Sequence, residues 1–311
     1  MLPGALFLLL GLALVIWGAE RSTEGAVGAA AWLRLSPFYV GIVVSGFEPE
    51  NLVTGLAAAL AGFPQVALGT VVGSTIFLLT GALGLTLLLV PMEVRIPRAG
   101  AAAMAVSLGA FVAALLPAGR IGRLQGALLL ALAVGLLAWL YRRSPAFLPR
   151  EGDEPNGGAP SPPRMVARLV LGAAGMVLGA ELVVAGVSRL VATAGLSETF
   201  LGMTAVGMGE SVEEMARMVT PARRGHPELA WGNVVGTVVI LLGVNLGIIA
   251  LVAPLVAAPL VLRLHVPYLA GTVLLVATCL GLARRLGRGT GLGLLGLYTS
   301  YLLLNLWREL R

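Results

Sequence analysis

Two short acidic stretches lie inside apolar parts of this chain, and both could bind a cation. Ser45–Asn51 reads S-G-F-E-P-E-N, and Gly209–Glu214 reads G-E-S-V-E-E. An ionised carboxylate in hydrocarbon is strongly disfavoured unless it is paired, protonated or hydrated, and a bound cation provides that compensation. Gly and Pro beside the acids weaken a helix and free backbone carbonyls. Carboxylate and carbonyl oxygens are hard ligands, which suit Ca²⁺, Na⁺ or Mg²⁺.

The second stretch has helical spacing. Glu210, Glu213, Glu214 and Arg217 stand at i, i+3, i+4 and i+7, which is one face of a helix. One interpretation turns Glu210 and Glu214 towards a shared cation cavity. The other pairs Glu213 or Glu214 with Arg217 as a structural salt bridge, and Glu213 is the residue that fits this role best.

A repeated segment follows each acidic stretch. Pro64–Ser74 reads P-Q-V-A-L-G-T-V-V-G-S and Pro227–Thr237 reads P-E-L-A-W-G-N-V-V-G-T, with six identities in eleven positions. Its glycines form small-x-x-x-small patterns, whose simplest role is close helix packing. Ser74 and Thr237 could add neutral oxygen ligands, although each could equally form a hydrogen bond between helices. The repetition indicates an internally duplicated chain, as in many transporters.

Composition places the chain in a membrane. Hydrophobic residues make up 58% of it, charged residues only 12%, and mean hydropathy is +0.94, whereas soluble domains have about 25% charged residues. The net charge of +6 is explained by basic cytoplasmic loops rather than by nucleic-acid binding. The single Cys279 excludes an internal disulfide and any metal site with several cysteines.

The sequence predicts an all-α membrane protein of ten transmembrane helices. The expected spans are 2–31, 36–62, 66–90, 98–118, 122–141, 165–193, 197–221, 228–253, 256–281 and 290–307. A polar linker, 142–164, separates a first five-helix repeat, 1–141, from a second, 165–311. An odd number of spans per repeat implies inverted topology. Arginine placement then predicts a multi-pass cell-membrane protein with both termini outside and the linker inside.

The paired motifs resemble those of the cation/calcium exchanger superfamily, which includes the sodium/calcium exchangers. That family carries G-T-S-L-P-E followed by G-N-x-x-G-S-N in each of two inverted halves. Here G-E-S-V-E-E (Gly209–Glu214), G-N-V-V-G-T (Gly232–Thr237) and G-T-V-V-G-S-T (Gly69–Thr75) match parts of this pattern. The resemblance assigns the family's ion-binding glutamate to Glu214. In the first half, the Pro-Glu pair assigns it to Glu50, whereas a gapless count back from Ser74 reaches Asn51.

The resemblance implies a secondary-active cation antiporter that exchanges Ca²⁺ for Na⁺ or H⁺, not an enzyme, with transported cations and the bilayer as its partners and no cofactor. Glu48 and Glu210 would flank the two central ligands, and Ser211, Ser74 and Thr237 would complete the shell. The chain has Leu78 and Leu241 where sodium/calcium exchangers place an acidic or amide residue, which leaves the counter-ion open.

Three alternatives remain at this point: a proton-coupled antiporter for another cation, a passive cation channel, and a non-transporting scaffold. An intramembrane serine hydrolase is disfavoured because neither histidine of the sequence lies in the middle of a predicted span. Oligomeric state is left open.

Overall fold

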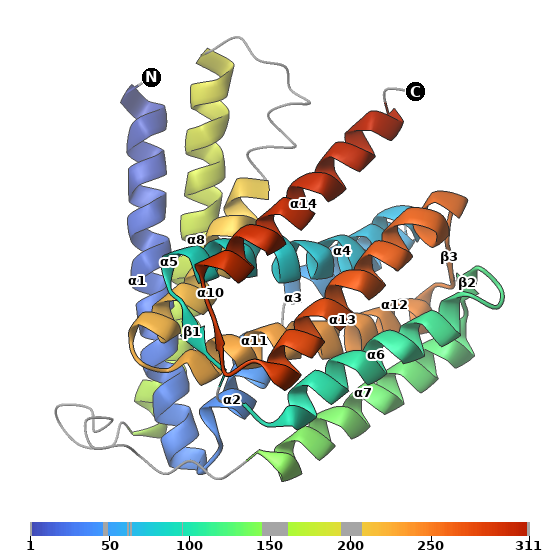
Figure 1. Cartoon of the computed structure of the whole chain (residues 1–311). Helices are drawn as coiled ribbons and strands as arrows, with labels where there is room; N and C mark the ends of the chain where they lie inside the picture. The colour runs from blue at the N-terminus through green and yellow to red at the C-terminus, as the bar shows by residue number, and fades with distance from the viewer. Residues whose placement is uncertain are drawn as a thin grey trace. The chain divides into compact units, whose positions relative to one another are not determined.

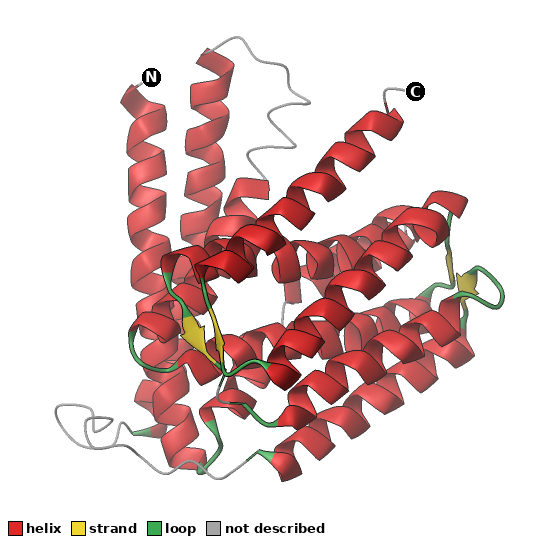
Figure 2. Cartoon of the chain, viewed as in Figure 1, coloured by secondary structure: helices red, strands yellow, loops and turns green. Residues whose placement is uncertain are grey.

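The computed structural model describes residues 2–45, 49–60, 62, 64–94, 96–144, 161–193 and 207–309, and nearly all of them are helical (Figure 2). The long apolar runs explain this, because a backbone without access to water must satisfy its hydrogen bonds within helices. Within the predicted spans, most of the described residues are helical. Residues 197–206 and the linker residues 145–160 lie outside the described part.

The helices and strands follow in chain order (Figure 1). They are α1 (Leu2–Leu33), α2 (Pro37–Val40), the π-helical turn η1 (Gly41–Ser45), α3 (Pro49–Leu60), α4 (Pro64–Phe77), the π-helical turn η2 (Leu78–Ala82), α5 (Leu83–Leu89), β1 (Met92–Glu93), α6 (Arg98–Leu115), β2 (Arg120–Ile121), α7 (Arg123–Arg143), α8 (Pro162–Thr193), α10 (Gly207–Arg223), α11 (Pro227–Val239), the π-helical turn η4 (Ile240–Asn245), α12 (Leu246–Val252), β3 (Leu255–Val256), the π-helical turn η5 (Val261–His265), α13 (Val266–Leu282), β4 (Arg285–Leu286) and α14 (Arg288–Glu309).

Among the described residues, six helical stretches are long and apolar enough to cross a bilayer. They are Pro3–Leu33, Ala67–Leu89, Arg98–Leu115, Arg123–Arg143, Pro227–Val252 and Val261–Leu282. The prediction of a helical membrane protein is therefore supported at this level. The count of ten spans and their inverted arrangement stay predictions.

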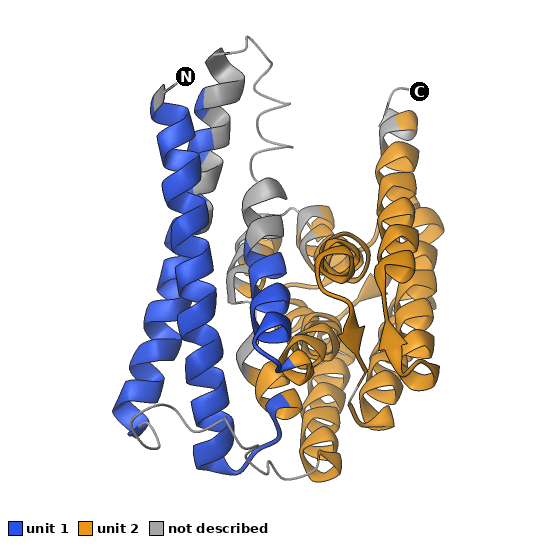
Figure 3. Ribbon diagram, turned by 60° about the vertical axis from the view of Figure 1, so that its left-hand side comes forward, with its two compact units in different colours: residues 1–37, 146–226 blue, residues 38–145, 227–311 orange. Residues whose placement is uncertain are grey.

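The chain forms two compact units, each built from both predicted halves (Figure 3). Unit 1 comprises residues 1–37 and 146–226, and unit 2 comprises residues 38–145 and 227–311. Helices α1, α8 and α10 belong to unit 1, and the remaining helices and strands belong to unit 2. The two units therefore differ from the predicted sequence repeats, 1–141 and 165–311. The bounds of the repeats stay a prediction.

In unit 1, α1 and α8 pack as an antiparallel pair through glycines. A Cβ added to Gly18 would lie 2.6 Å from the carbonyl oxygen of Gly172, and one added to Gly186 would lie 2.8 Å from that of Gly4. The contact positions run in opposite directions along the two helices, which shows that they are antiparallel. Such close backbone approach is possible only because these positions lack side chains.

In unit 2, the same arrangement of elements occurs twice. The π-helical turn η2 follows α4 as η4 follows α11, although π-helical turns are rare. Two short antiparallel bridges also correspond: β1 pairs with β4, and β2 pairs with β3. Each bridge joins a loop of the first half to a loop of the second, so the duplication seen in the sequence extends to elements that the sequence pattern did not predict.

The duplication extends to helix contacts in unit 2. A Cβ added to Gly84 on α5 would lie 3.0 Å from the carbonyl oxygen of Gly291 on α14. In the corresponding pair, a Cβ added to Gly247 on α12 would lie 2.8 Å from the carbonyl oxygen of Gly126 on α7. The same kind of glycine contact therefore holds α14 against α5 and α7 against α12.

The α7–α12 contact yields a stability prediction. Gly126→Ala would place a methyl group 2.8 Å from the carbonyl oxygen of Gly247, and overpacking of this kind costs about 1–3 kcal/mol. Gly135→Ala on the same helix is the matched control, because an added Cβ meets no described atom within 4 Å and alanine favours helix by about 0.5–1 kcal/mol. Thermal unfolding in detergent should show a lower Tm for Gly126→Ala only. Equal Tm values for the two variants would contradict the proposed contact.

Candidate functional site

The acidic part of α10 holds two carboxylates on one arginine. Glu213 pairs with the Arg217 guanidinium at spacing i, i+4, and Glu214 pairs with the same guanidinium at i, i+3, with 3.2 Å between Glu214 Oε1 and Arg217 Nη1. The three side chains are only 9–12% exposed. Both candidate salt bridges predicted from the spacing are therefore present together. Glu214 is an Arg217 partner as well as the predicted ligand.

Several predicted ligands cannot be compared with the structure. Glu210 and Ser211 lie on the backbone of α10 and Glu50 on that of α3, but their side chains lie outside the described part of the structure. Glu48 lies outside the described residues altogether. Their roles as ligands stay predictions.

Asn51 and Ser74 are brought together in unit 2. The Ser74 hydroxyl, on α4, donates a hydrogen bond of 3.1 Å to Oδ1 of Asn51, on α3. Both residues were candidate ligands, and the bond links the first-half acidic stretch to the first copy of the repeated motif. The hydroxyl donates its single hydrogen to Asn51. The lone pairs of the Ser74 oxygen can therefore accept a further hydrogen bond or bind a cation.

Thr237 lies in the second copy of the motif, on α11. Its side chain is fully buried, as is that of the neighbouring Asn233. A Cβ added to Gly236 would lie 2.6 Å from the Ile42 carbonyl oxygen, and one added to Gly232 would lie 2.2 Å from that of Phe38. The packing role predicted for the glycines is confirmed in this second copy, where they let α11 touch α2 and η1 directly. In the first copy, a Cβ added to Gly69 or Gly73 would meet no described atom within 4 Å, so the packing role is not seen there.

Leu78 and Leu241 are buried, with 1% and 0% of their surface exposed. Each lies in a π-helical turn, η2 or η4. These positions therefore contribute apolar packing rather than oxygen ligands, in keeping with the departure noted in the sequence.

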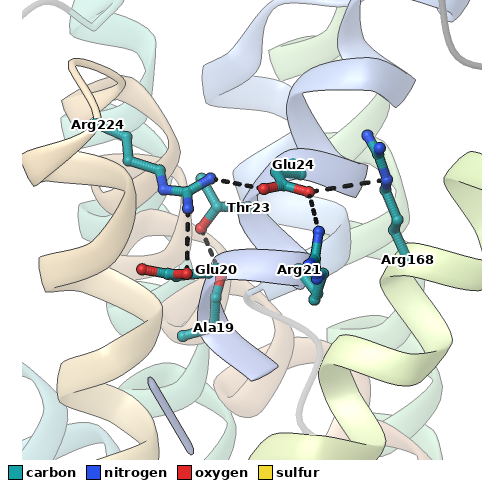
Figure 4. A network of polar contacts seen from close by, with 7 residues as sticks. All are labelled: Ala19, Glu20, Arg21, Thr23, Glu24, Arg168 and Arg224. Carbon is teal, nitrogen blue, oxygen red and sulfur yellow. Dashed lines mark hydrogen bonds and ion pairs between the residues drawn. The ribbon is translucent and has the colours of Figure 1, made fainter. Parts of the chain in front are cut away.

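A second charged cluster occupies unit 1, and sequence reasoning did not foresee it. Figure 4 shows Arg224, from the end of α10, between Glu20 and Glu24 of α1, at 3.3 and 3.1 Å. Glu24 is also within 3.0 Å of Arg21 and 3.7 Å of Arg168 on α8. Glu20 therefore has a structural role as a partner of Arg224. The contacts span about 150–200 residues of sequence, so local spacing gave no signal for them beyond the Arg21–Glu24 pair.

One further buried carboxylate, Glu228, was not among the residues predicted from the sequence to bind a cation. Glu228 stands in the first turn of α11 and is 9% exposed. A carboxylate in this position interacts favourably with the helix N-terminus, so its placement has a structural explanation. The only available signal was its position directly after Pro227, where helices commonly begin.

The candidate ligands fall into two sets. Glu213, Glu214 and Arg217 belong to unit 1, whereas Asn51, Ser74 and Thr237 belong to unit 2. Each set consists of polar side chains that are buried or half-buried. Their convergence on one ion stays a prediction.

The shared arginine yields a second prediction. Arg217→Gln would leave two buried carboxylates without their common partner, which typically costs about 3–5 kcal/mol. Arg224→Gln, at the C-terminal end of the same helix, is the matched control: its pairs are 28–47% exposed and should contribute less than about 1 kcal/mol. Adding Glu213→Gln to Arg217→Gln should restore part of the loss. Thermal unfolding in detergent would rank the variants, and a larger loss for Arg224→Gln would contradict this assignment.

Comparison with known proteins agrees with these features. The family model described as "Sodium/calcium exchanger protein" matches residues 3–142 and 165–307. A relative named as the putative antiporter CaxA of Alkalimonas amylolytica is 30% identical over 97% of this chain and 98% of its own length. The inner membrane protein YrbG of Escherichia coli (strain K12) is 28% identical over 99% and 98% of the two chains.

The fold also matches a solved structure. The sodium-calcium exchanger NCX_Mj superposes with a TM-score of 0.80 and 25% identity, over 97% of this chain and 98% of that one. The family is one of transporters, which confirms the resemblance drawn from the paired motifs and rules against the hydrolase alternative. On the match of the family model to both halves, the chain belongs to the sodium/calcium exchanger protein family.

Proposed function

We propose that this protein is a secondary-active antiporter that exchanges Ca²⁺ for Na⁺ or H⁺ across the cell membrane. Family membership and the match to NCX_Mj support cation antiport, and the relative CaxA is itself named as an antiporter. The choice between Na⁺ and H⁺ as counter-ion is part of the proposal and is decided by transport measurements.

The observation that carries the proposal is the Glu213–Arg217–Glu214 triad. It places two carboxylates in a nearly buried part of unit 1. A carboxylate in a low-dielectric interior is costly unless cations or protons accompany it, and its oxygens are hard ligands for such cations. Exchange follows naturally, because removing one cation restores the cost until another cation or proton replaces it.

The ligand set extends this triad to both halves. Glu214 and either Glu50 or Asn51 would be the central ligands, with Glu48 and Glu210 beside them and Ser211, Ser74 and Thr237 completing the shell. The hydrogen bond between Ser74 and Asn51 supports a first-half contribution. The full burial of Thr237 is compatible with a neutral ligand in the second half.

The architecture that we propose has ten spans in two inverted repeats, 1–141 and 165–311, joined by a cytoplasmic linker at 142–164, with both termini outside. Two observations support it. The corresponding helices α1 and α8 run antiparallel, as equivalent helices of inverted repeats must. The bridges β1–β4 and β2–β3 repeat one contact between the halves.

Transport in reconstituted liposomes tests the proposal. Uptake of ⁴⁵Ca²⁺ should require an outward gradient of Na⁺ or of H⁺, applied separately, and should show no current-carrying leak in their absence. Glu214→Gln removes a charged oxygen ligand, so uptake should fall at least about tenfold, the factor given by about 1.4 kcal/mol of lost binding.

The control for that substitution is Glu93→Gln, which changes an exposed carboxylate on β1 and should leave uptake near that of the unmodified protein. Uptake that ignores both gradients would indicate a channel or a scaffold instead. Full uptake by a folded Glu214→Gln variant would remove that residue from the ligand set.

A further inference from the structure

The charged cluster of unit 1 holds more arginines than carboxylates. Glu24 has three arginine partners, which are Arg21 of α1, Arg168 of α8 and Arg224 of α10. Arg224 also pairs with Glu20 (Figure 4), and three positive groups against two negative ones leave a formal charge of +1. The five side chains are 28–47% exposed. A partly exposed cluster with a surplus of arginine attracts anions.

Arg168 is the member of this cluster that keeps free donors. It reaches Glu24 only through Nε, at 3.7 Å, and Figure 4 shows the outer end of its guanidinium turned away from Glu24. Within the described part of the chain, neither Nη atom of Arg168 has an ion-pair or hydrogen-bond partner. Arg21, by contrast, donates to Glu24 and lies over the Trp17 ring. Because a guanidinium is a planar fork of donors that matches a phosphate, Arg168 is the group that can bind one.

Arg164 adds a second free guanidinium on the same face of α8. It stands four residues, about one helical turn, before Arg168. Its side chain is exposed and pairs with no carboxylate among the residues that the structure describes. The first acidic residue of α8 is Glu181, about five turns further along the helix. An anion can therefore bridge the two arginines without meeting a carboxylate of their own helix.

An exposed apolar face continues along α8 from these arginines. Its members are 44–61% exposed, and they are Val170, Leu171, Val177 and Leu178. From Arg168 to Leu178 the helix rises about 15 Å, which is half of the hydrocarbon core of a bilayer, about 30 Å thick. Guanidinium donors at one end of an apolar surface about one leaflet long match the headgroup and the acyl chains of a phospholipid.

We propose that Arg164 and Arg168 bind the phosphate of an anionic phospholipid whose acyl chains lie along the exposed face of α8. Basic groups of membrane helices at the cytoplasmic side bind such headgroups, and the topology proposed above places the start of α8 on that side. A zwitterionic lipid offers the same phosphate, but its cationic group meets the surplus positive charge, so the site prefers a headgroup with net negative charge. The site goes beyond the proposed antiport, because it takes no part in binding the transported cation.

Quenching of Trp17 fluorescence by a dibrominated phosphatidylglycerol, added to the protein in detergent, tests the site locally. The Trp17 ring is 41% exposed, and a Cβ added to Gly175 of α8 would lie 3.0 Å from it, so Trp17 lies beside the proposed acyl-chain surface. The chain has five tryptophans. Subtracting the signal of a Trp17→Phe variant therefore removes the contribution of the other four.

Neutralising the two arginines should weaken lipid binding in steps. The lipid concentration for half-maximal quenching should rise about fivefold in Arg164→Gln and about 25-fold in Arg164→Gln/Arg168→Gln, because each arginine near an anionic lipid contributes a factor of about five. The matched control is Arg120→Gln/Arg123→Gln, which removes two exposed arginines of unit 2 and should leave the midpoint unchanged. An unchanged midpoint in Arg164→Gln/Arg168→Gln, or an equal rise in the control, would overturn the proposal.

Two further probes identify the occupant. A dibrominated phosphatidylcholine should quench Trp17 only at higher concentration than the anionic lipid, and equal midpoints for the two lipids would refute the preference for negative charge. Inorganic phosphate at the concentration of the lipid should leave the quenching unchanged. Displacement of the lipid by inorganic phosphate would show a site for a free anion and would rule out the phospholipid as its ligand.

Glu24→Gln should change the affinity in the opposite direction. It removes one of the two carboxylates, so the formal charge of the cluster rises from +1 to +2, and the anionic lipid should quench Trp17 at lower concentration. A cluster with a purely structural role would not bind lipid more tightly after losing its central carboxylate. With folding checked by thermal unfolding, a midpoint that stays constant or rises in Glu24→Gln would contradict the site. None of these measurements depends on ⁴⁵Ca²⁺ uptake, so the lipid site and the antiport can fail separately.

Discussion

Charge held inside an apolar chain is the constraint on which the rest of this structure depends. Glu213 and Glu214 are nearly buried and share Arg217, and a buried carboxylate without such a partner is costly. In the proposed exchange, the arginine keeps the carboxylates in position, and their oxygens bind a cation that must be able to leave again.

Close backbone contact is the second condition, because it decides which polar groups can meet. Gly232 and Gly236 let α11 approach η1 until side chains no longer separate the two backbones, and Gly18 and Gly172 do the same for α1 and α8. In a bilayer, helices gain little from hydrophobic burial against one another, and such contacts supply van der Waals packing instead. In the second copy of the motif, the glycines thus form the close contact that positions the oxygen-bearing residues beside them.

The sequence predicted the helices well and the contacts between them poorly, for a physical reason. Apolar runs define helices locally, and the small-x-x-x-small patterns marked a close approach that the structure confirms at Gly232. Pairing across long distances leaves no such trace: nothing local predicts that Arg224 meets Glu24, or that β1 joins β4. The hydrogen bond between Ser74 and Asn51 could be predicted only in part. Both were candidates by type, but only the fold brings them into contact.

The two halves share a framework without sharing chemistry. The π-helical turns η2 and η4 lie at corresponding places, and such a turn adds one residue and rotates the rest of the helix about its axis. The last residue of η4 is Asn245, whereas the corresponding first-half position holds Ala82. Trp231 likewise donates a hydrogen bond of 2.8 Å to the Glu93 carbonyl oxygen, where the first copy of the motif has Leu68. A duplicated scaffold can therefore keep its framework while diverging at single buried positions.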